Sequence, residues 1–370
     1  MAAPLKDSFG ADVPALVAAP FAAVDNDFDV DGFERYCLDG YLELELTPRA
    51  RLISDGLAAF LPADRGRALD LLVASLAHGR DPATFEGMDG FRYLPHVFFV
   101  ADHGLDHFER AMTAQYELTK RFTAEFSIRA YLVHHRDATL RRLREWTDDP
   151  DVHVRRLVSE GTRPRLPWAP RLKEFQADPG PVLDLLERLR DDSEEYVRRS
   201  VANNLNDISK DHPDVVIEVA RRWWSDGDHD RRRLVRHGLR TLIKRGDPGA
   251  LDVLGYAAST PVTIDRVDIS PASVPIGGRV TIELSLTNPS TEEAGALVDL
   301  RIHFVKANGS TSPKVFKGRE LRLLPGESGV VRKSVSVAQH STRTHHAGTH
   351  MVEAMVSGAV QPVGSFELTD

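Results

Sequence analysis

The spacing of hydrophobic residues changes along the chain from a helical period to a strand period. In the first part, apolar residues recur three and four positions apart, as in the run Val182–Leu189, which is the stripe of an amphipathic helix. After Thr260 apolar and polar residues alternate, as in the run Val280–Leu286, which is typical of half-buried strands. The pattern predicts a helical domain over residues 1–258 and a β-domain over residues 262–370.

The β-domain has the signature of a sandwich. Alternation continues through the run Val298–Phe304, and the pairs Asn308-Gly309 and Pro325-Gly326 supply turn signals between strands. Several short strands in about 110 residues are typical of an immunoglobulin-like sandwich. The single cysteine of the chain, Cys37, lies outside this region, so the cysteine pair of antibody domains is absent.

A weak repeat divides the helical part. The triplet Val-Arg-Arg occurs at residues 154–156 and again at 197–199, 43 positions later, with a degenerate copy at 230–236. This spacing is typical of HEAT-like helix pairs, which stack into a solenoid with a concave face. We therefore predict an all-α HEAT-like solenoid followed by an all-β immunoglobulin-like sandwich. Recurring arginines along one wall suit a phosphate backbone, although many such solenoids bind proteins.

The charge distribution is uneven. The net charge is −8, which by itself argues against nucleic acid as a partner. Residues 121–173 nevertheless hold 12 Lys and Arg against 7 Asp and Glu, and residues 221–245 hold 9 against 3. Such stretches attract a polyanion, but solvated helix faces explain charge counts equally simply.

The cellular setting follows from what the sequence lacks. No signal-peptide pattern follows the first residues, and no apolar run is long enough to span a bilayer. One cysteine suits a reducing compartment. We expect a cytoplasmic monomer without a membrane partner.

Helical-wheel positions single out carboxylates that could be functional. If residues 115–132 form one helix, Glu125 and Arg129 share its apolar face, as a buried ion pair or as part of a site. Glu160 falls beside Arg156 on the outer side of its helix, where a solvated surface pair is the default interpretation. Asp207 flanks a polar face whose side chains suit either phosphate or solvent. That face carries Arg199, Asn203, Asn206 and Lys210.

A proline-flanked loop lies between these helices. Pro164 and Pro167 restrict the backbone and thereby hold Arg163 and Arg165 forward and fix the direction of Trp168. Packing in a core is the ordinary role of a tryptophan, but an indole near acids and arginines can also offer its π face to a cation.

Four stretches resemble the AlkC family of bacterial alkylpurine DNA glycosylases, which are HEAT-like repeat proteins. They are residues 155–168 and 199–213, with shorter stretches at 5–10 and 122–129. The C-terminal sandwich, which some members carry, adds to the resemblance. It implies removal of 3-methyladenine and related cationic methylated bases from double-stranded DNA by a monofunctional reaction with water. The family is described as leaving the damaged base unflipped, and no metal or organic cofactor is expected.

The resemblance also implies site residues. By motif, the acids near the lesion are Glu125, Glu160 and Asp207, and the aromatic ring is Trp168. These carboxylates would stabilise the positive charge that moves onto the deoxyribose as the base departs. The expected phosphate-binding residues are Arg155, Arg156, Arg163, Arg165, Arg199, Asn203 and Lys210.

Two alternatives remain open on the residues alone. The chain could be a HEAT-repeat scaffold that binds DNA or protein without catalysis. It could also be a metal-dependent hydrolase that uses the histidines near the end of the sandwich, although a surface loop explains them better. These histidines are His340, His345, His346 and His350.

The sandwich itself could provide a further DNA contact. Basic residues gather around the turn at 308–309 and near His346, where loops of such domains commonly bind partners. They are Lys306, Lys314, Lys317, Arg319 and Arg343.

Overall fold

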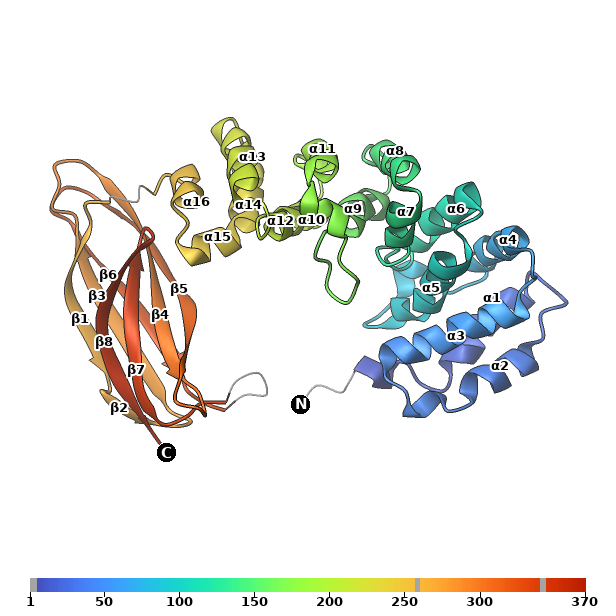
Figure 1. The fold of residues 1–370 in the computed structure, drawn as a ribbon, viewed down its shortest axis with the longest axis horizontal. Coiled ribbons are helices and arrows are strands. Elements are labelled where there is room, and N and C mark those ends of the chain that lie inside the picture. The colour runs from blue at the N-terminus through green and yellow to red at the C-terminus, as the bar shows by residue number, and fades with distance from the viewer. Residues whose placement is uncertain (1–4, 257–259, 340–343) are drawn as a thin grey trace. The chain divides into compact units, whose positions relative to one another are not determined.

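The chain folds into helices first and strands second (Figure 1). The structure, a computed structural model, describes residues 5–256, 260–339 and 344–370. They form two compact units, Met1–Asp211 and His212–Asp370. Ala258, the expected end of the helical domain, lies outside the described residues, as do His340 and Arg343.

The described residues of the first unit form helices and no strands. Its α-helices are α1 (Val13–Ala22), α2 (Val30–Leu38), α3 (Leu46–Phe60), α4 (Arg65–Leu76), α5 (Leu94–His103), α6 (Phe108–Thr119), α7 (Ile128–His134), α8 (Arg136–Trp146), α9 (Val152–Gly161), α10 (Lys173–Ala177), α11 (Gly180–Leu189) and α12 (Glu195–Ile208). Short 3-10 helices lie at Leu5–Ser8, Tyr41–Glu43, Pro82–Thr84 and Asp89–Tyr93.

The helical periodicity of the sequence predicts the buried faces of this unit correctly. The apolar stripe of α11 is buried, and so are the four apolar positions of α12. The helices begin where capping residues allow. The carboxylate of Asp151 accepts hydrogen bonds from the first free N–H groups of α9, and Pro181 lies in the first turn of α11. The two Val-Arg-Arg triplets lie on α9 and α12, which pack against each other as equivalent helices of adjacent repeats.

The expectation of one helix through residues 115–132 is wrong. Helix α6 ends at Thr119 and α7 begins at Ile128, so Glu125 lies in a turn between them. Thr123 causes much of this interruption. Its hydroxyl accepts a hydrogen bond from the Glu125 backbone N–H at 3.2 Å and donates one to the Glu125 carboxylate at 2.8 Å, which competes with helical hydrogen bonding.

The second unit combines the last helices with the sandwich. The helices are α13 (Pro213–Ser225), α14 (His229–Gly238), α15 (Arg240–Arg245) and α16 (Pro248–Val253). The strands are β1 (Thr263–Ser270), β2 (Ser273–Pro275), β3 (Arg279–Thr287), β4 (Ala294–Val305), β5 (Thr311–Leu323), β6 (Ser328–Ser336), β7 (Gly348–Val356) and β8 (Ala359–Thr369). Leu251, Leu254 and Tyr256 pack with Leu297 of β4, so the helices and the sandwich of this unit share a small core.

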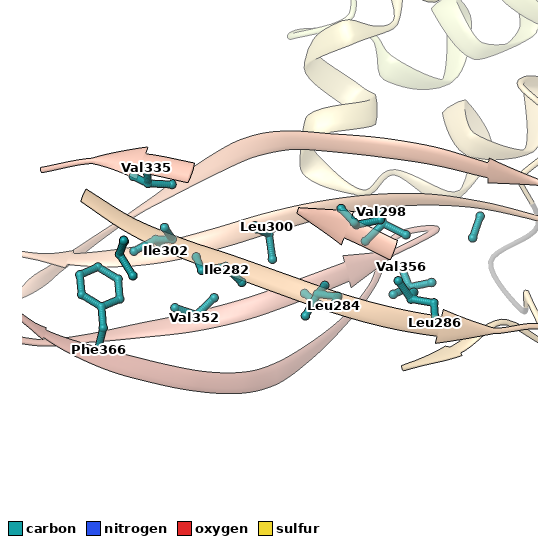
Figure 2. Packing of buried hydrophobic residues seen from close by; sticks show 14 of the residues in the cluster. Ile282, Leu284, Leu286, Val298, Leu300, Ile302, Val335, Val352, Val356 and Phe366 are labelled. Carbon is teal, nitrogen blue, oxygen red and sulfur yellow. The ribbon is translucent and has the colours of Figure 1, made fainter. Parts of the chain in front are cut away.

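The strands form two sheets, with orders β1-β3-β6 and β2-β8-β7-β4-β5. Alternate residues of β3 and β4 point inward, and their apolar side chains meet those of β7 and β8 between the sheets (Figure 2). Gly309 and Gly326 adopt left-handed backbone conformations in the turns that the sequence indicated. The all-α then all-β fold class is therefore confirmed.

Two of the histidines near the end of the sandwich, His345 and His350, lie in its core, and His346 is half-buried. The rings of His345 and His350 are buried beside Phe304, with centroids 5.2 and 5.5 Å away. Burial lowers the pKa of His350. Across the described ranges, no group of three or more His, Cys, Asp or Glu could hold a metal ion. In the same ranges, no helix has the length and apolar character needed to cross a bilayer.

Candidate active site

The three predicted acids lie on neighbouring elements of the first unit. Glu125 is in the turn before α7, Glu160 is on α9 and Asp207 is on α12. All three are buried, although buried carboxylates are rare without partners. Each therefore needs cations or hydrogen-bond donors close by.

Glu160 is only 5% exposed, so its interpretation as part of a solvated surface pair is wrong. Its Oε1 accepts a hydrogen bond from Arg163 at 2.5 Å, and its Oε2 accepts one from the Ser200 hydroxyl at 2.6 Å. Burial acts to raise the pKa of Glu160, but Arg156, Arg163 and the Ser200 hydrogen bond outweigh it and hold the pKa below its ordinary value. The side chain is consequently an anion at neutral pH.

Asp207 is 2% exposed and is held by two cations. Its Oδ2 accepts a hydrogen bond from Arg163 Nε, and its Oδ1 accepts one from Lys210 Nζ, both at 2.8 Å. Arg163 thus bridges Asp207 and Glu160 from a single guanidinium group. This bridge fixes the two carboxylates relative to each other.

Glu125 is joined to the same network through Arg156. Its Oε2 accepts a hydrogen bond from Arg156 Nη1 at 2.7 Å, and Arg156 Nη2 lies 3.5 Å from Glu160. Of the two alternatives left open for Glu125 and Arg129, the i,i+4 ion pair is not formed, because Arg129 donates to backbone carbonyls instead. The broken helix explains this difference.

The acids and cations therefore alternate in a continuous chain: Glu125, Arg156, Glu160, Arg163, Asp207, Lys210. Carboxylates held between cations in this way have a fixed position, and the lowered pKa of Glu160 keeps that side chain ionised at neutral pH. Such a group is suited to stabilise a developing positive charge and to orient a water molecule. It is poorly suited to act as a general acid.

Trp168 is presented to solvent on the proline-flanked loop. Its side chain is 76% exposed, and its φ is 63°, a left-handed conformation that is uncommon outside glycine. Leu166 of the same loop is buried and anchors it. Packing in the core is therefore excluded as the role of Trp168, since a large apolar ring is held out where a ligand can meet it.

The predicted phosphate-binding cations have several roles. Arg155 binds Asp192 with two hydrogen bonds, at 2.7 and 3.1 Å, and Arg165 binds Asp211 in the same way at 2.9 and 2.5 Å. Arg199 is exposed and Asn203 is half-buried on α12. Ion pairs with the three acids engage Arg156, Arg163 and Lys210, as described above. Of this set, Arg199 and Lys210 have the exposure that a phosphate contact needs, and the set as a whole stays a prediction.

Sequence reasoning missed two polar residues that complete the site. Besides Ser200, Asn204 is fully buried, and its Nδ2 donates to the Ser159 carbonyl at 2.8 Å and to the Thr162 hydroxyl at 3.1 Å. Both residues fall within the apolar stripe of α12, three and seven positions after Val197. A polar residue at such a position is the signal that could have identified them.

Comparison with known proteins agrees with this arrangement. Residues 119–244 match the family described as "DNA alkylation repair enzyme". Residues 263–370 match the family described as "Uncharacterised protein YhaZ, C-terminal Ig-like domain". The first range includes all four residues predicted to act on the lesion.

Two similar proteins cover nearly the whole chain. YhaZ of Bacillus subtilis (strain 168) is 34% identical over 331 residues, which is 90% of this chain and 89% of that protein. The solved structure of the Pseudomonas fluorescens alkylpurine DNA glycosylase AlkC, bound to DNA containing an abasic site analog, is 36% identical, with a TM-score of 0.89 over 100% of both chains. The protein therefore belongs to the AlkC family of alkylpurine DNA glycosylases, in the form that carries a C-terminal immunoglobulin-like domain.

Proposed function

We propose that this protein hydrolyses the N-glycosidic bond of cationic alkylated bases, with 3-methyladenine as the reference substrate, in double-stranded DNA. The observation that carries the proposal is the chain of alternating acids and cations that holds the buried side chains of Glu125, Glu160 and Asp207 in fixed positions. The exposed indole of Trp168 adds a surface suited to a cationic base.

The chemistry needs this kind of site. Alkylation leaves the base positively charged, so the bond to C1′ breaks with its electron pair moving to the base, which departs neutral. Positive charge then builds on the deoxyribose, and the carboxylates stabilise it electrostatically. A water oxygen attacks C1′ and loses its proton to a carboxylate or to bulk water. The products are a free methylated base and an abasic site, as expected for a monofunctional glycosylase.

Selectivity for cationic lesions follows from the charge of the site. Since Glu160 has a lowered pKa, it holds no proton to give a neutral leaving group at neutral pH. An unmodified base would have to depart as an anion beside fixed carboxylates, which oppose it. A base that is already cationic needs no proton, and negative side chains attract it.

The DNA partner is proposed on two grounds. The AlkC structure to which this chain is similar was solved bound to DNA with an abasic site analog. Arg199 and Asn203 lie on α12, the helix that carries Asp207, and provide groups able to bind phosphate beside the acids. From the resemblance to the family alone, we further propose that the base is attacked without being flipped out of the duplex.

Release of base from methylated duplex DNA in the presence of EDTA tests the function. We expect free 3-methyladenine, identified by mass spectrometry, together with an abasic strand that stays unbroken until alkali is added. A protein that binds the duplex but releases no base beyond the spontaneous rate would be a scaffold. Base release that EDTA abolishes would favour a metal-dependent hydrolase.

A further inference from the structure

Arg129 of α7 is a buried charge whose partners are neutral. It is 5% exposed, and it forms no ion pair with an acid in the part of the chain that the structure describes. Burial is the main reason that its pKa falls to about 10, opposed by Glu125 and reinforced by Arg163. It still carries its charge at neutral pH. Keeping a charge buried in this way is costly unless its hydrogen bonds serve the structure.

Those hydrogen bonds go to the two ends of one loop and to Gly161, the last residue of α9 before it. Nη1 donates to the carbonyls of Gly161 at 3.2 Å and Arg163 at 2.7 Å, and Nη2 donates to the carbonyl of Pro170. The carbonyls of Arg163 and Pro170 lie toward the two ends of the proline-flanked loop, which we define as residues 162–172. Closure of the loop is completed by a backbone hydrogen bond from Leu172 N–H to the Pro164 carbonyl at 3.2 Å. A single planar guanidinium thus ties the start of the loop to its end.

The loop carries two groups of the candidate site. Near its start, Arg163 bridges Glu160 and Asp207. Near its end, Trp168 is held in its left-handed conformation. For a residue other than glycine this conformation is strained, and it persists only where surrounding contacts impose it. The hydrogen bonds from Arg129 close the loop on both sides of Trp168 and provide such contacts.

We propose that Arg129 is the positioning residue of the glycosylase site, holding the loop 162–172 so that Trp168 stays presented to the base. This proposal rests on the proposed function. The role needs a guanidinium, because three carbonyls in different directions match its fork of donors, whereas a lysine ammonium is a point donor on a flexible stem. Arg129 acts through Trp168 and does not touch the substrate.

Arg49 offers a matched control. It is also 5% exposed, and its guanidinium also donates to backbone carbonyls, those of Lys6, Phe9, Leu42 and Leu44. These contacts lie among the first helices, apart from the residues of the site. Arg49→Met therefore removes the same chemistry from the same unit without removing any contact to the loop.

The first test reads the position of Trp168 without using catalysis. Full-length protein labelled with 5-fluorotryptophan gives ¹⁹F resonances, and Trp168→Phe identifies the one that belongs to Trp168. We expect Arg129→Met and Arg129→Lys to shift or broaden that resonance while the signals of Trp146 and Trp223 keep their positions. Arg49→Met should leave the Trp168 resonance unchanged. An unmoved Trp168 resonance in both Arg129 variants overturns the proposal, whatever the protein does to DNA.

The second test is a double-mutant cycle on single-turnover base release. We expect Arg129→Met to slow excision at least ~10-fold in the wild-type background and less than ~3-fold when Trp168 is already alanine, because coupled residues are not additive. Arg129→Lys covers the case in which the methionine variant does not fold. Equal slowing in both backgrounds would show that Arg129 does not act through Trp168. If wild-type protein releases no base, the proposed function fails and the ¹⁹F result alone decides the role of Arg129.

Discussion

Replacement of Asp207 by asparagine tests the electrostatic role of the buried acids. The substitution keeps size and shape, but it removes a charge that accepts hydrogen bonds from Arg163 and Lys210. The asparagine oxygen can still face one of these cations. Its NH₂ group must then face the other cation, and no hydrogen bond can form there because both groups are donors.

Two costs follow, and they differ in kind. Breaking a buried ion pair, here that of Arg163 with Asp207, destabilises a fold by up to about 3–5 kcal/mol. Two unit charges ~4 Å apart interact by about 4 kcal/mol at an effective dielectric constant of ~20. This value is an upper limit on the electrostatic stabilisation that Asp207 can provide to a positively charged deoxyribose. Arg163 and Lys210 offset part of this attraction. We therefore expect the variant to lose about as much transition-state stabilisation as an enzyme loses when one preorganised active-site group is removed. Such a loss slows the chemical step roughly 100- to 1000-fold.

The assay is single-turnover release of 3-methyladenine from a defined duplex, with binding to the same duplex measured separately. DNA affinity should stay within a few-fold of wild type, since the variant loses a negative charge and no phosphate contact. Asp192→Asn is the matched control, because the side chain of Asp192 is only 4% exposed and also binds an arginine, Arg155. It should lose stability but keep its excision rate. A folded Asp207→Asn protein that excises within a few-fold of wild type would refute the reasoning.

Four further predictions follow. Glu160→Gln should slow excision by at least ~10-fold while DNA binding is retained, since it removes a fixed anion of the same network; an unchanged single-turnover rate would make Glu160 structural. Trp168→Ala should impair excision of cationic bases more than of neutral ones, by on the order of 1–2 kcal/mol if the indole contributes a cation–π contact; equal losses on both would exclude that contact. Burial lowers the pKa of His96 to about 3, so the free energy of unfolding should fall by roughly 1.4 kcal/mol per pH unit as the pH drops from about 6.5 toward about 3. Urea titrations at several pH values should show that the free energy of unfolding depends less on pH in His96→Phe. An identical pH dependence in the two proteins would contradict this assignment. Replacing Lys306, Lys317 and Arg319 together by glutamine should reduce the slope of log K for DNA binding against log salt concentration, by up to about 0.9 for each phosphate contact that is lost. An unchanged slope would show that these residues of the sandwich do not contact DNA.

These charge substitutions are a better test of the sandwich than its deletion. Leu251 and Tyr256 of the preceding helical segment pack with Leu297 of β4, and Tyr256 also donates a hydrogen bond to Glu320 at 2.5 Å. A chain cut near residue 258 would expose this core. Loss of activity in the truncated protein could then reflect misfolding, whereas surface glutamines leave the core intact.

The architecture was predictable because its signals are local. Apolar spacing of three and four identifies the buried face of α11 from the sequence alone, and strict alternation does the same for β3. The packing of the last helices on the sandwich was not predicted, since periodicity shows which face is buried but not which partner covers it. The break between α6 and α7 was missed because it depends on the hydroxyl of one threonine, Thr123.

The site was only partly predictable for a related reason. The resemblance to a family identified the acids, and the structure joins them into one network. Glu160 was expected at the surface because its own helix places it opposite Val154 and Leu157. Its burial depends on Ser200 from another helix and Arg163 from the loop, contacts that no helical wheel contains. The link from Arg129 to the loop is of the same kind, since it joins residues 32 to 41 positions apart.

The central claim is that fixed carboxylates accelerate the loss of bases that are already positively charged. The most direct measurement compares two duplexes that differ at one base, one with cationic 3-methyladenine and one with a neutral lesion such as hypoxanthine. Each single-turnover rate with wild-type protein in EDTA is divided by the spontaneous rate of loss of the same base. We predict an enhancement of several orders of magnitude for the cationic base and little for the neutral one. Equal enhancement of both, or none for 3-methyladenine on bound DNA, would contradict the account.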